Sequence, residues 1–525
     1  MNEADKGKIC LGALLFTPLV TWFIAAKSLY GFTPKDARER LVLLIQQTFD
    51  LWPLWGALLA GEIVAIIGLI IFFKFNHQIF KGAPFKKIYR GTRLVSKRAL
   101  ASLTKEREPQ ITIADIPIPT KAEATHISIA GATGVGKSTI FAEMMKCCLM
   151  RGKMERVASK KDRMIILDPD GDFLSRFYKK GDKILNPYDA RTEGWVFFNE
   201  IKSDFDFERF GVSIVPTAKD SQTEEWNGYG RLLFTEVARK VFNTSRNPTM
   251  EEVFYWTNEV PLEELEGYVR GTKAQALFAG SGRAVGSARF VLSNKLAAHL
   301  KMPTGDFSIR EWLDDPNGGN LYITWTDEMR EALKSLISCW TDSIFSIVLG
   351  MSSSHTRKIW TFIDELESLD YLPSLRDALT KGRKKGLRVV TGYQSYSQVI
   401  SIYGSDVAET LLSNHRTSVV MAAGRLGERT LEFVSKSLGE IEGEREKTGI
   451  SRRFGQLGTK NTNEDHKRER AVTPTEIATL DDLTGYIAFP GSLPVAKFET
   501  HHVKYTRSNP VPGVVLREST AFAGM

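Results

Sequence analysis

The chain has 525 residues, which is more than one ordinary domain and predicts two or three structural units. Its four cysteines form no C-x-x-C pair, so the sequence predicts neither a zinc site nor a disulfide framework. The net charge of +8 is concentrated, because residues 74–98 hold eight Lys or Arg and no acid. The rest of the chain is balanced, so its overall charge says little about nucleic-acid binding.

Two apolar segments near the N-terminus are each long enough to cross about 30 Å of hydrocarbon as a helix. Residues 9–26 carry no charge, and residues 51–73 are interrupted only by Glu62. A signal peptide is the alternative for the first segment, but no small-residue cleavage site follows it and a second span does. We therefore expect a two-span membrane anchor.

The basic residues 74–98 predict the orientation of this anchor. By the positive-inside rule they place the rest of the chain in the cytoplasm, with one short periplasmic loop between the spans. They are also expected to hold anionic membrane lipid. For Glu62 two interpretations stay open: satisfaction by the neighbouring helix, or contact with a membrane partner or another subunit.

A glycine-rich segment fits the phosphate-binding loop pattern G-x-x-x-x-G-K-[ST] at every fixed position. Its glycines let successive N–H groups curl around an anion, and the helix expected to begin near Lys137 adds its positive end. Lys137 is expected to reach the β- and γ-phosphates of ATP, and the Ser138 hydroxyl to ligate Mg²⁺. The residues predicted to hold the nucleotide are Gly131, Thr133, Gly134, Gly136, Lys137, Ser138 and Thr139.

Beyond about residue 110, β-rich runs alternate with helical stretches, which predicts an α/β P-loop NTPase with a RecA-like parallel sheet. The runs expected to form the parallel core are 164–168, 320–325, 358–364, 387–391 and 417–421. Two of these strands end in aspartate. Glu365 follows Asp364 directly, whereas the turn after Asp168 contains proline and glycine and no glutamate. We therefore predict Asp364 as a Mg²⁺ ligand through water, and Glu365 as the general base.

The stretch between Asp168 and residue 320 is longer than a compact P-loop core requires and is mostly helical in pattern. It predicts an inserted all-helical subdomain. Within it, residues 267–302 carry six Lys or Arg and no acid. Such a run is by default a solvated face, and contact with a phosphate backbone is the alternative.

Two further groups extend the predicted site. A basic cluster at 381–388 could complement the dipole at a helix end, or bring an arginine to the γ-phosphate of a neighbouring subunit. For the second role Arg383 is the candidate, with Arg416 as the alternative. Gln394 ends the strand after Asp364, where its amide could sense the γ-phosphate or orient water. The predicted catalytic residues are Lys137, Glu365, Gln394 and Arg383.

These patterns divide the chain into expected domains. Residues 440–470 are polar and predict a mobile loop. The expected divisions are a membrane anchor at 1–75, a P-loop nucleotide-binding domain at 76–182 with 300–510, an inserted all-α domain at 183–299 and a flexible tail at 511–525.

The whole set of motifs resembles the type IV coupling proteins of bacterial conjugation. The stretches that carry the resemblance are GATGVGKST, LDPDGDF, IWTFIDELESL, GRKKGLRVVTGYQS and SNHRTSVVMAAG. The resemblance implies an inner-membrane homo-hexamer with a nucleotide site between subunits and a DNA-stimulated ATPase that pumps single-stranded plasmid DNA. It also implies two partners, the relaxase–DNA complex and the inner-membrane components of a type IV secretion system.

The resemblance assigns Lys137 and Ser138 to the phosphate loop, Asp364 and Glu365 to the second motif, Gln394 to a sensor and Arg383 to a trans arginine finger. The end of this chain departs from relatives with a long acidic tail, because Glu518 is the only acid among the last twenty residues. Alternatives to DNA pumping are a coupling ATPase for protein substrates and a docking receptor in which nucleotide controls assembly. A double-strand chromosome translocase is a further alternative, but such pumps typically carry more spans and a DNA-reading C-terminal module.

Overall fold

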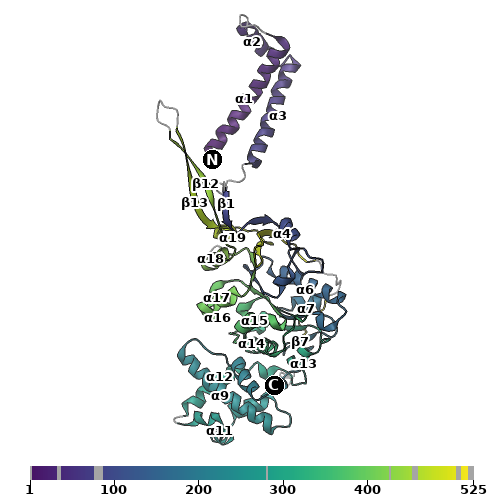
Figure 1. The fold of residues 1–525 in the computed structure, drawn as a ribbon, viewed down its shortest axis with the longest axis vertical. Coiled ribbons are helices and arrows are strands. Elements are labelled where there is room, and N and C mark those ends of the chain that lie inside the picture. Colours follow the sequence, from purple (N-terminus) through teal and green to yellow (C-terminus); the bar gives the residue numbers. More distant parts are fainter. Residues whose placement is uncertain are drawn as a thin grey trace, which may run out of the picture. The chain divides into compact units, whose positions relative to one another are not determined.

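The structure is a computed structural model that describes residues 3–31, 37–75, 87–279, 282–424, 427–451, 459–503 and 510–517 (Figure 1). It divides into two compact units. The first comprises Met1–Tyr89 and Glu442–Lys467, and the second comprises Arg90–Ile441 and Arg468–Met525. The candidate site lies wholly in the second unit.

The first unit contains a hairpin of two long apolar helices, α1 (Glu3–Tyr30) and α3 (Trp52–Phe75), with α2 (Ala37–Gln46) between them. Cys10–Tyr30 and Trp52–Phe72 are each long and apolar enough to cross a membrane. The helices approach closely at small residues, where Thr21 Oγ1 donates a hydrogen bond to the Ala57 carbonyl at 2.8 Å. This pattern is typical of helix packing in a membrane, where small residues let backbones approach.

A third helix, α14 (Asp327–Gly350), is also long and apolar enough to span a membrane. In the structure 72% of this stretch is buried inside the protein. It is therefore a core helix of the second unit, which shows why hydropathy alone does not separate a membrane span from a buried helix.

A ten-stranded sheet forms the centre of the second unit. In spatial order its strands are β2 (Leu94–Ser96), β15 (Val495–Glu499), β14 (Thr484–Ala488), β11 (Thr417–Met421), β5 (Ile127–Ala130), β10 (Leu387–Tyr393), β9 (Lys358–Ile363), β6 (Asp162–Pro169), β8 (Leu321–Trp325) and β7 (Lys183–Leu185). The seven strands from β11 to β7 are parallel. The predicted parallel core is confirmed.

The strands are buried on both faces, as parallel strands between helical layers must be. Side chains alternate along β6, so Met164 and Ile166 enter one hydrophobic cluster while Ile165 and Leu167 enter the other. The helices that cover the sheet or connect its strands are α4 (Lys97–Thr104), α5 (Thr120–Glu123), α6 (Lys137–Met154), α7 (Asp172–Phe177), α15 (Leu375–Lys381), α16 (Tyr396–Tyr403), α17 (Ser405–Ser413), α18 (Glu428–Ser437) and α19 (Pro474–Ala478).

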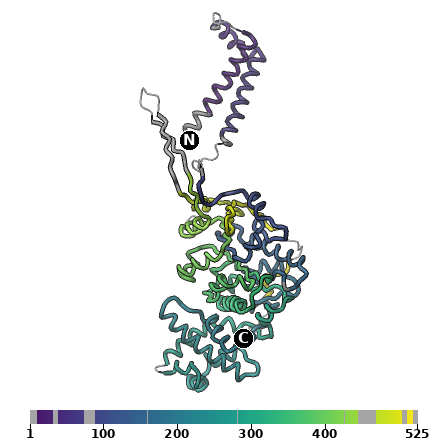
Figure 2. Tube along the Cα trace, in the orientation of Figure 1, coloured from purple at the N-terminus to yellow at the C-terminus, as the bar shows by residue number. Residues whose placement is uncertain are grey.

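The excess length of the chain is a helical insertion between β7 and β8, as predicted. One continuous stretch of chain forms it, as the teal segment of Figure 2 shows. Its main helices are α8 (Phe205–Ile214), α9 (Ser221–Thr244), α10 (Met250–Phe254), α11 (Leu262–Val269), α12 (Arg283–Leu296) and α13 (Ile309–Asp314).

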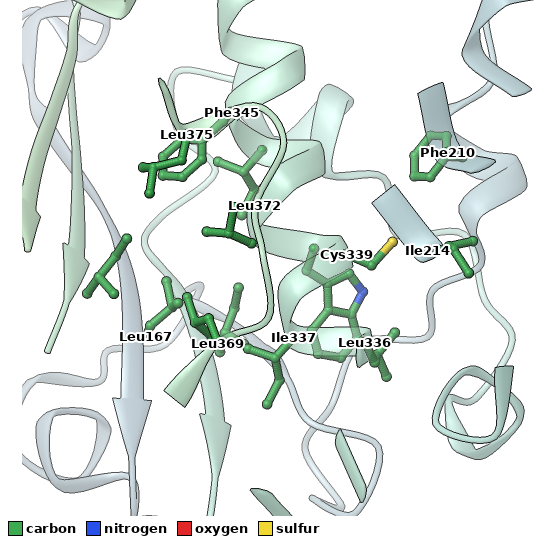
Figure 3. Close-up of a cluster of buried hydrophobic side chains, with 14 of the residues drawn as sticks. Leu167, Phe210, Ile214, Leu336, Ile337, Cys339, Phe345, Leu369, Leu372 and Leu375 are labelled. Atoms are coloured by element: carbon green, nitrogen blue, oxygen red, sulfur yellow. The ribbon is translucent and has the colours of Figure 1, made fainter. Parts of the chain in front are cut away.

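The insertion shares its core with the sheet. Phe210 and Ile214 of α8 lie in the same cluster as Cys339 of α14 and Leu167 of β6 (Figure 3). A buried Trp195–Trp340 pair with ring centroids 5.9 Å apart adds to this core. The shared core fixes the helical insertion to the sheet.

Two sequence expectations need correction. Residues 440–470, predicted as a mobile loop, contain the strands β12 (Glu440–Ser451) and β13 (Thr459–Arg470), which form a sheet with β1 (Lys87–Gly91). The polar composition of these strands gave no sequence signal for them, because backbone pairing needs no apolar face.

Residues 511–517, predicted as part of a flexible tail, are hydrogen-bonded to the body. Val511 N donates to Ser175 O, and Arg517 N donates to Tyr188 O. Residues 518–525 lie outside the described residues.

Candidate nucleotide-binding site

The phosphate-binding loop connects the buried strand β5 to helix α6, as predicted. Gly134 and Gly136 adopt positive φ values of 80° and 104°, which side-chain-bearing residues rarely adopt. A Cβ on Gly136 would also lie 2.5 Å from Leu483 Cδ2. The loop therefore needs glycine at residue 136 for both its conformation and its packing.

Lys137 lies at the start of α6 and folds back into the loop. Its ammonium group donates to the carbonyls of Gly131 and Ala132 at 2.8 and 2.9 Å. Burial lowers the pKa of Lys137, although nearby Asp364, Glu367 and Glu365 favour its charged form. The lysine is thus a buried cation aimed at the inside of an anion-binding loop.

The predicted metal ligands face each other across the sheet edge. Ser138 Oγ donates to Asp364 Oδ2 at 2.8 Å, and Asp364 Oδ1 is buried without a hydrogen-bond partner among the described residues. Burial raises the pKa of Asp364, while Ser138 and Lys137 act in the opposite direction. No group of three or more His, Cys, Asp or Glu that could hold a metal ion lies within the described parts of the chain. Mg²⁺ is usually held by one or two protein oxygens together with phosphates and water, and Ser138 and Asp364 offer such oxygens.

Gln394 connects the phosphate loop to the predicted base. Its Oε1 accepts a hydrogen bond from Thr133 Oγ1 at 2.8 Å, and its Nε2 donates to Glu365 Oε1 at 2.8 Å. The amide therefore has both ends occupied, and its orientation follows from its two partners. A change at the loop tip reaches Glu365 through this one side chain.

A third carboxylate, Glu367, was missed by the sequence reasoning. Its Oε1 accepts hydrogen bonds from the backbone N–H groups of Gln394 and Ser395. Its Oε2 is buried without a partner in the described structure, and burial raises its pKa. Its place two residues after Glu365 was the available signal. Glu367 fixes the backbone that carries Gln394.

Asp168, the rejected candidate for the metal, has a structural role. Its carboxylate accepts from the backbone N–H groups of Phe173 and Leu174 at 3.1 and 2.6 Å, at the start of α7. It is fully buried, and burial raises its pKa to about 8. Both oxygens are committed to the helix, which leaves Asp364 as the aspartate bonded to Ser138.

The two candidate arginine fingers lie away from the loop of their own chain. Arg383 precedes β10, and Arg416 precedes β11, where its N–H donates to the Thr125 carbonyl at 2.9 Å. Because β5, β10 and β11 are parallel and the loop follows β5, both arginines lie at the opposite edge of the sheet. Either could reach a nucleotide only in a neighbouring molecule.

The basic stretch 267–302 is less free than its sequence indicates. Arg289 Nη2 donates to the Val260 carbonyl at 2.6 Å, and Lys295 pairs with Asp370 at 3.1 Å. The remaining four cations are exposed: Arg270, Lys273, Arg283 and Lys301. A solvated cationic face therefore exists, but it is smaller than predicted.

The site consists of a buried strand, a glycine loop and a helix. A lysine, a serine, two carboxylates and a glutamine lie with them at the carboxyl edge of a parallel sheet. These features define a P-loop nucleotide-binding protein. Residues 110–501 match the sequence profile of the type IV secretion-system coupling protein DNA-binding domain. The chain belongs to this family, which confirms the resemblance seen in its motifs.

Individual relatives agree with this assignment. The coupling protein TraD of Escherichia coli (strain K12) is 28% identical over 509 residues, which cover 92% of this chain and 68% of TraD. The plasmid coupling protein TrwB in complex with ADP and Mg²⁺ has a TM-score of 0.75 and 47% identity, covering 83% of this chain and 98% of that one. TrwB with a non-hydrolysable ATP analogue has a TM-score of 0.76 and 46% identity, covering 83% and 99%.

Proposed function

We propose that this protein is a membrane-anchored ATPase that couples the relaxase–plasmid DNA complex to a type IV secretion system and pumps single-stranded DNA during conjugation. The observation that carries the hydrolytic part is the chain of hydrogen bonds from Thr133 through Gln394 to Glu365. A protein that only bound nucleotide would need the loop and the lysine. A glutamate hydrogen-bonded to a glutamine beside the loop provides the base and the polar group that hydrolysis requires.

The cofactors of the proposed reaction are ATP and Mg²⁺, in keeping with the ligands of the TrwB structures. Gly131, Gly134 and Gly136 shape the loop for the phosphates, with Thr133 at its tip and Thr139 in the first turn of α6. Ser138 and Asp364 would hold Mg²⁺, which neutralises phosphate charge when bound.

Each polar group then has a distinct task. Lys137 exchanges the Gly131 and Ala132 carbonyls for phosphate oxygens, which compensates its buried charge. Glu365 would take a proton from the attacking water. Gln394 holds the Glu365 carboxylate through its amide and would sense the γ-phosphate or orient that water. The catalytic set is Lys137, Glu365 and Gln394, completed by Arg383 from a neighbouring subunit.

The position of Arg383 at the sheet edge opposite its own loop requires a neighbouring subunit. The family resemblance implies that the assembly is a homo-hexamer. The two apolar helices of the first unit would anchor it in the bacterial inner membrane, with the ATPase body in the cytoplasm and basic residues 74–98 against anionic lipid. The proposed partners are single-stranded plasmid DNA, the relaxase and the inner-membrane components of the secretion system.

The test is ATP hydrolysis by the full chain in detergent, titrated with single-stranded DNA. We expect DNA to stimulate hydrolysis several-fold, and Lys137→Ala to abolish it. Glu365→Gln should bind nucleotide normally and hydrolyse it about 10²–10⁴-fold more slowly, the usual contribution of a general base. Stimulation by a protein substrate without any DNA response would select a protein-secretion ATPase instead. Binding without hydrolysis under all conditions would select a docking receptor.

A further inference from the structure

Helix α12 of the insertion carries a large aromatic ring in solvent. The Phe290 side chain is 67% exposed. The opposite face of the helix is buried through its apolar positions Val285, Ala288, Val291, Leu292 and Leu296. Phe290 is therefore on the outer face of a helix whose inner face is packed into the core.

Several contacts fix this helix against its neighbours. A Cβ on Gly230 of α9 would lie 2.9 Å from Val291 Cγ1, so α9 and α12 pack without a gap. Asn258 Nδ2 donates to the Arg289 carbonyl at 2.9 Å and to Ser293 Oγ at 2.7 Å. The ring is thus presented by a rigid element, and its exposure is not the fraying of a loose segment.

The segment that carries Phe290 is cationic or neutral. Residues 267–302 contain no Asp or Glu. Arg283 lies two turns earlier on the same side of α12, is exposed, and forms no ion pair with any described residue. Between them Gly286 has open space around its Cα, and Asn294 follows Phe290 by one turn. Helix α12 itself therefore carries no acid that would repel a phosphate backbone.

A second exposed phenylalanine in the same insertion provides a comparison. Phe205 at the start of α8 is 68% exposed, close to the 67% of Phe290. Its sequence neighbours are Asp204, Asp206 and Glu208, of which Asp204 and Glu208 pair with Arg239. The two rings are alike in type and exposure, but acids flank Phe205 in the sequence and no acid lies within 267–302 around Phe290. Phe290 is therefore the better suited of the two to a polyanionic partner.

We propose that Phe290 is a stacking platform for an unpaired base of single-stranded DNA, with Arg283 on the adjacent phosphate. Aromatic side chains beside cations bind single strands in this way, and stacking is tolerant of sequence because every base has a π-face. This rests on the proposed DNA-pumping function and assigns it a contact within the helical insertion.

The test measures binding of the full chain in detergent to a fluorescent oligo(dT) strand at several salt concentrations. We expect Phe290→Ala to weaken binding about 5- to 100-fold, as the loss of one stacked base does. The salt dependence should stay unchanged, because no phosphate contact is lost. Phe290→Tyr should bind like the wild type. Arg283→Ala should lower the slope of log K against log salt by about 0.7, the value for one phosphate on a single strand.

The matched control is Phe205→Ala, which removes an equally exposed ring and should leave binding unchanged. Equal affinities of Phe290→Ala and Phe205→Ala would overturn the stacking site. So would an equal loss of affinity for a blunt duplex, or a change in self-association of Phe290→Ala without DNA, since that ring would then serve a protein contact. If the wild type itself bound no single strand, the DNA-pumping function would fail before this question arose.

Discussion

At the scale of single residues, the site depends on polar side chains, most of them partly buried, that hydrogen-bond to one another. Gln394 is bonded through its side chain to Thr133 and Glu365 and through its backbone to Glu367. A hydrogen bond to an ionised group contributes more than a neutral one, and leaving a buried donor unpaired is costly. Glu367 therefore fixes the backbone of Gln394, the proposed catalytic amide, through hydrogen bonds to residues outside the nucleotide loop.

Replacement of Glu367 separates its hydrogen bonds from its charge. Glu367→Ala leaves the N–H groups of Gln394 and Ser395 unpaired, and we expect kcat for ATP to fall about 10- to 100-fold with little change in KM, in line with about 1–3 kcal/mol for such a loss. Glu367→Gln keeps an oxygen in place and should retain most of the activity. A Glu367→Gln protein as impaired as Glu367→Ala would show that the charge, not the hydrogen bonding, matters.

At the scale of elements, helices are fixed by individual caps and close contacts. Asp168 binds the first N–H groups of α7, and Gly61 lets α3 approach α1. The Asp168 side chain holds the start of the helix that follows it in the chain. At Gly61 the absence of a side chain lets two helices pack closely. Each gives an element-level prediction.

The buried cap predicts a pH dependence of stability. Because the folded-state pKa of Asp168 is raised to about 8, the folded protein keeps a proton that the unfolded chain loses near its ordinary value of 3.8. Stability should therefore decrease as pH rises from about 4 to about 8. Asp168→Asn keeps one acceptor and does not titrate. We expect its melting temperature to be lower at pH 6, and to change less than that of the wild type between pH 6 and 9 in thermal unfolding.

The membrane hairpin predicts a contrast between two glycines of α3. A Cβ on Gly61 would lie 2.1 Å from Thr21 Oγ1, whereas a Cβ on Gly68 would meet nothing within 4 Å. Gly61→Ala should lower the melting temperature of the hairpin in detergent, and Gly68→Ala should leave it unchanged or slightly higher, because alanine favours helix. Equal effects of the two substitutions, followed by far-UV circular dichroism, would mean that the close contact does not stabilise the hairpin.

At the scale of the whole molecule, the nucleotide site is expected to be completed by a second copy. The loop and its carboxylates lie at one edge of the sheet, and Arg383 lies at the other. A closed ring of identical subunits would bring the two edges together at every interface. Two inactive variants, one lacking the arginine and one lacking the lysine, should therefore complement each other in a mixed ring.

Subunits carrying Arg383→Ala and Lys137→Ala should each be inactive alone and partly active when mixed before assembly. In a random equal mixture, about a quarter of the interfaces in a closed ring join an intact loop to an intact arginine. DNA-stimulated ATPase activity should therefore recover to roughly that fraction of the wild type, by the same ring statistics. The matched mixture of Arg416→Ala with Lys137→Ala tests the alternative finger. No recovery with Arg383→Ala would remove it from the trans role.

The sequence alone determined the features that short-range patterns encode. The phosphate loop, the parallel strands and the acids that end them all follow from residue order, because backbone conformation and side-chain alternation are local. Family membership followed from the same motifs. Ser138 and Asp364 were each predicted as Mg²⁺ ligands, and the structure joins them by a hydrogen bond.

The tertiary structure decided what depends on residues far apart. It placed the apolar helix α14 in the core, showed that polar residues 440–470 contain two strands, and packed residues 511–517 on the body. It also showed that Glu367 holds the backbone of Gln394. Of the six cations at 267–302, it showed that Arg289 and Lys295 bond to neighbouring residues and that the other four are exposed. Whether a residue is buried, paired or solvated depends on the residues that surround it in space. The same residue order is compatible with a buried or an exposed side chain until those spatial neighbours are known.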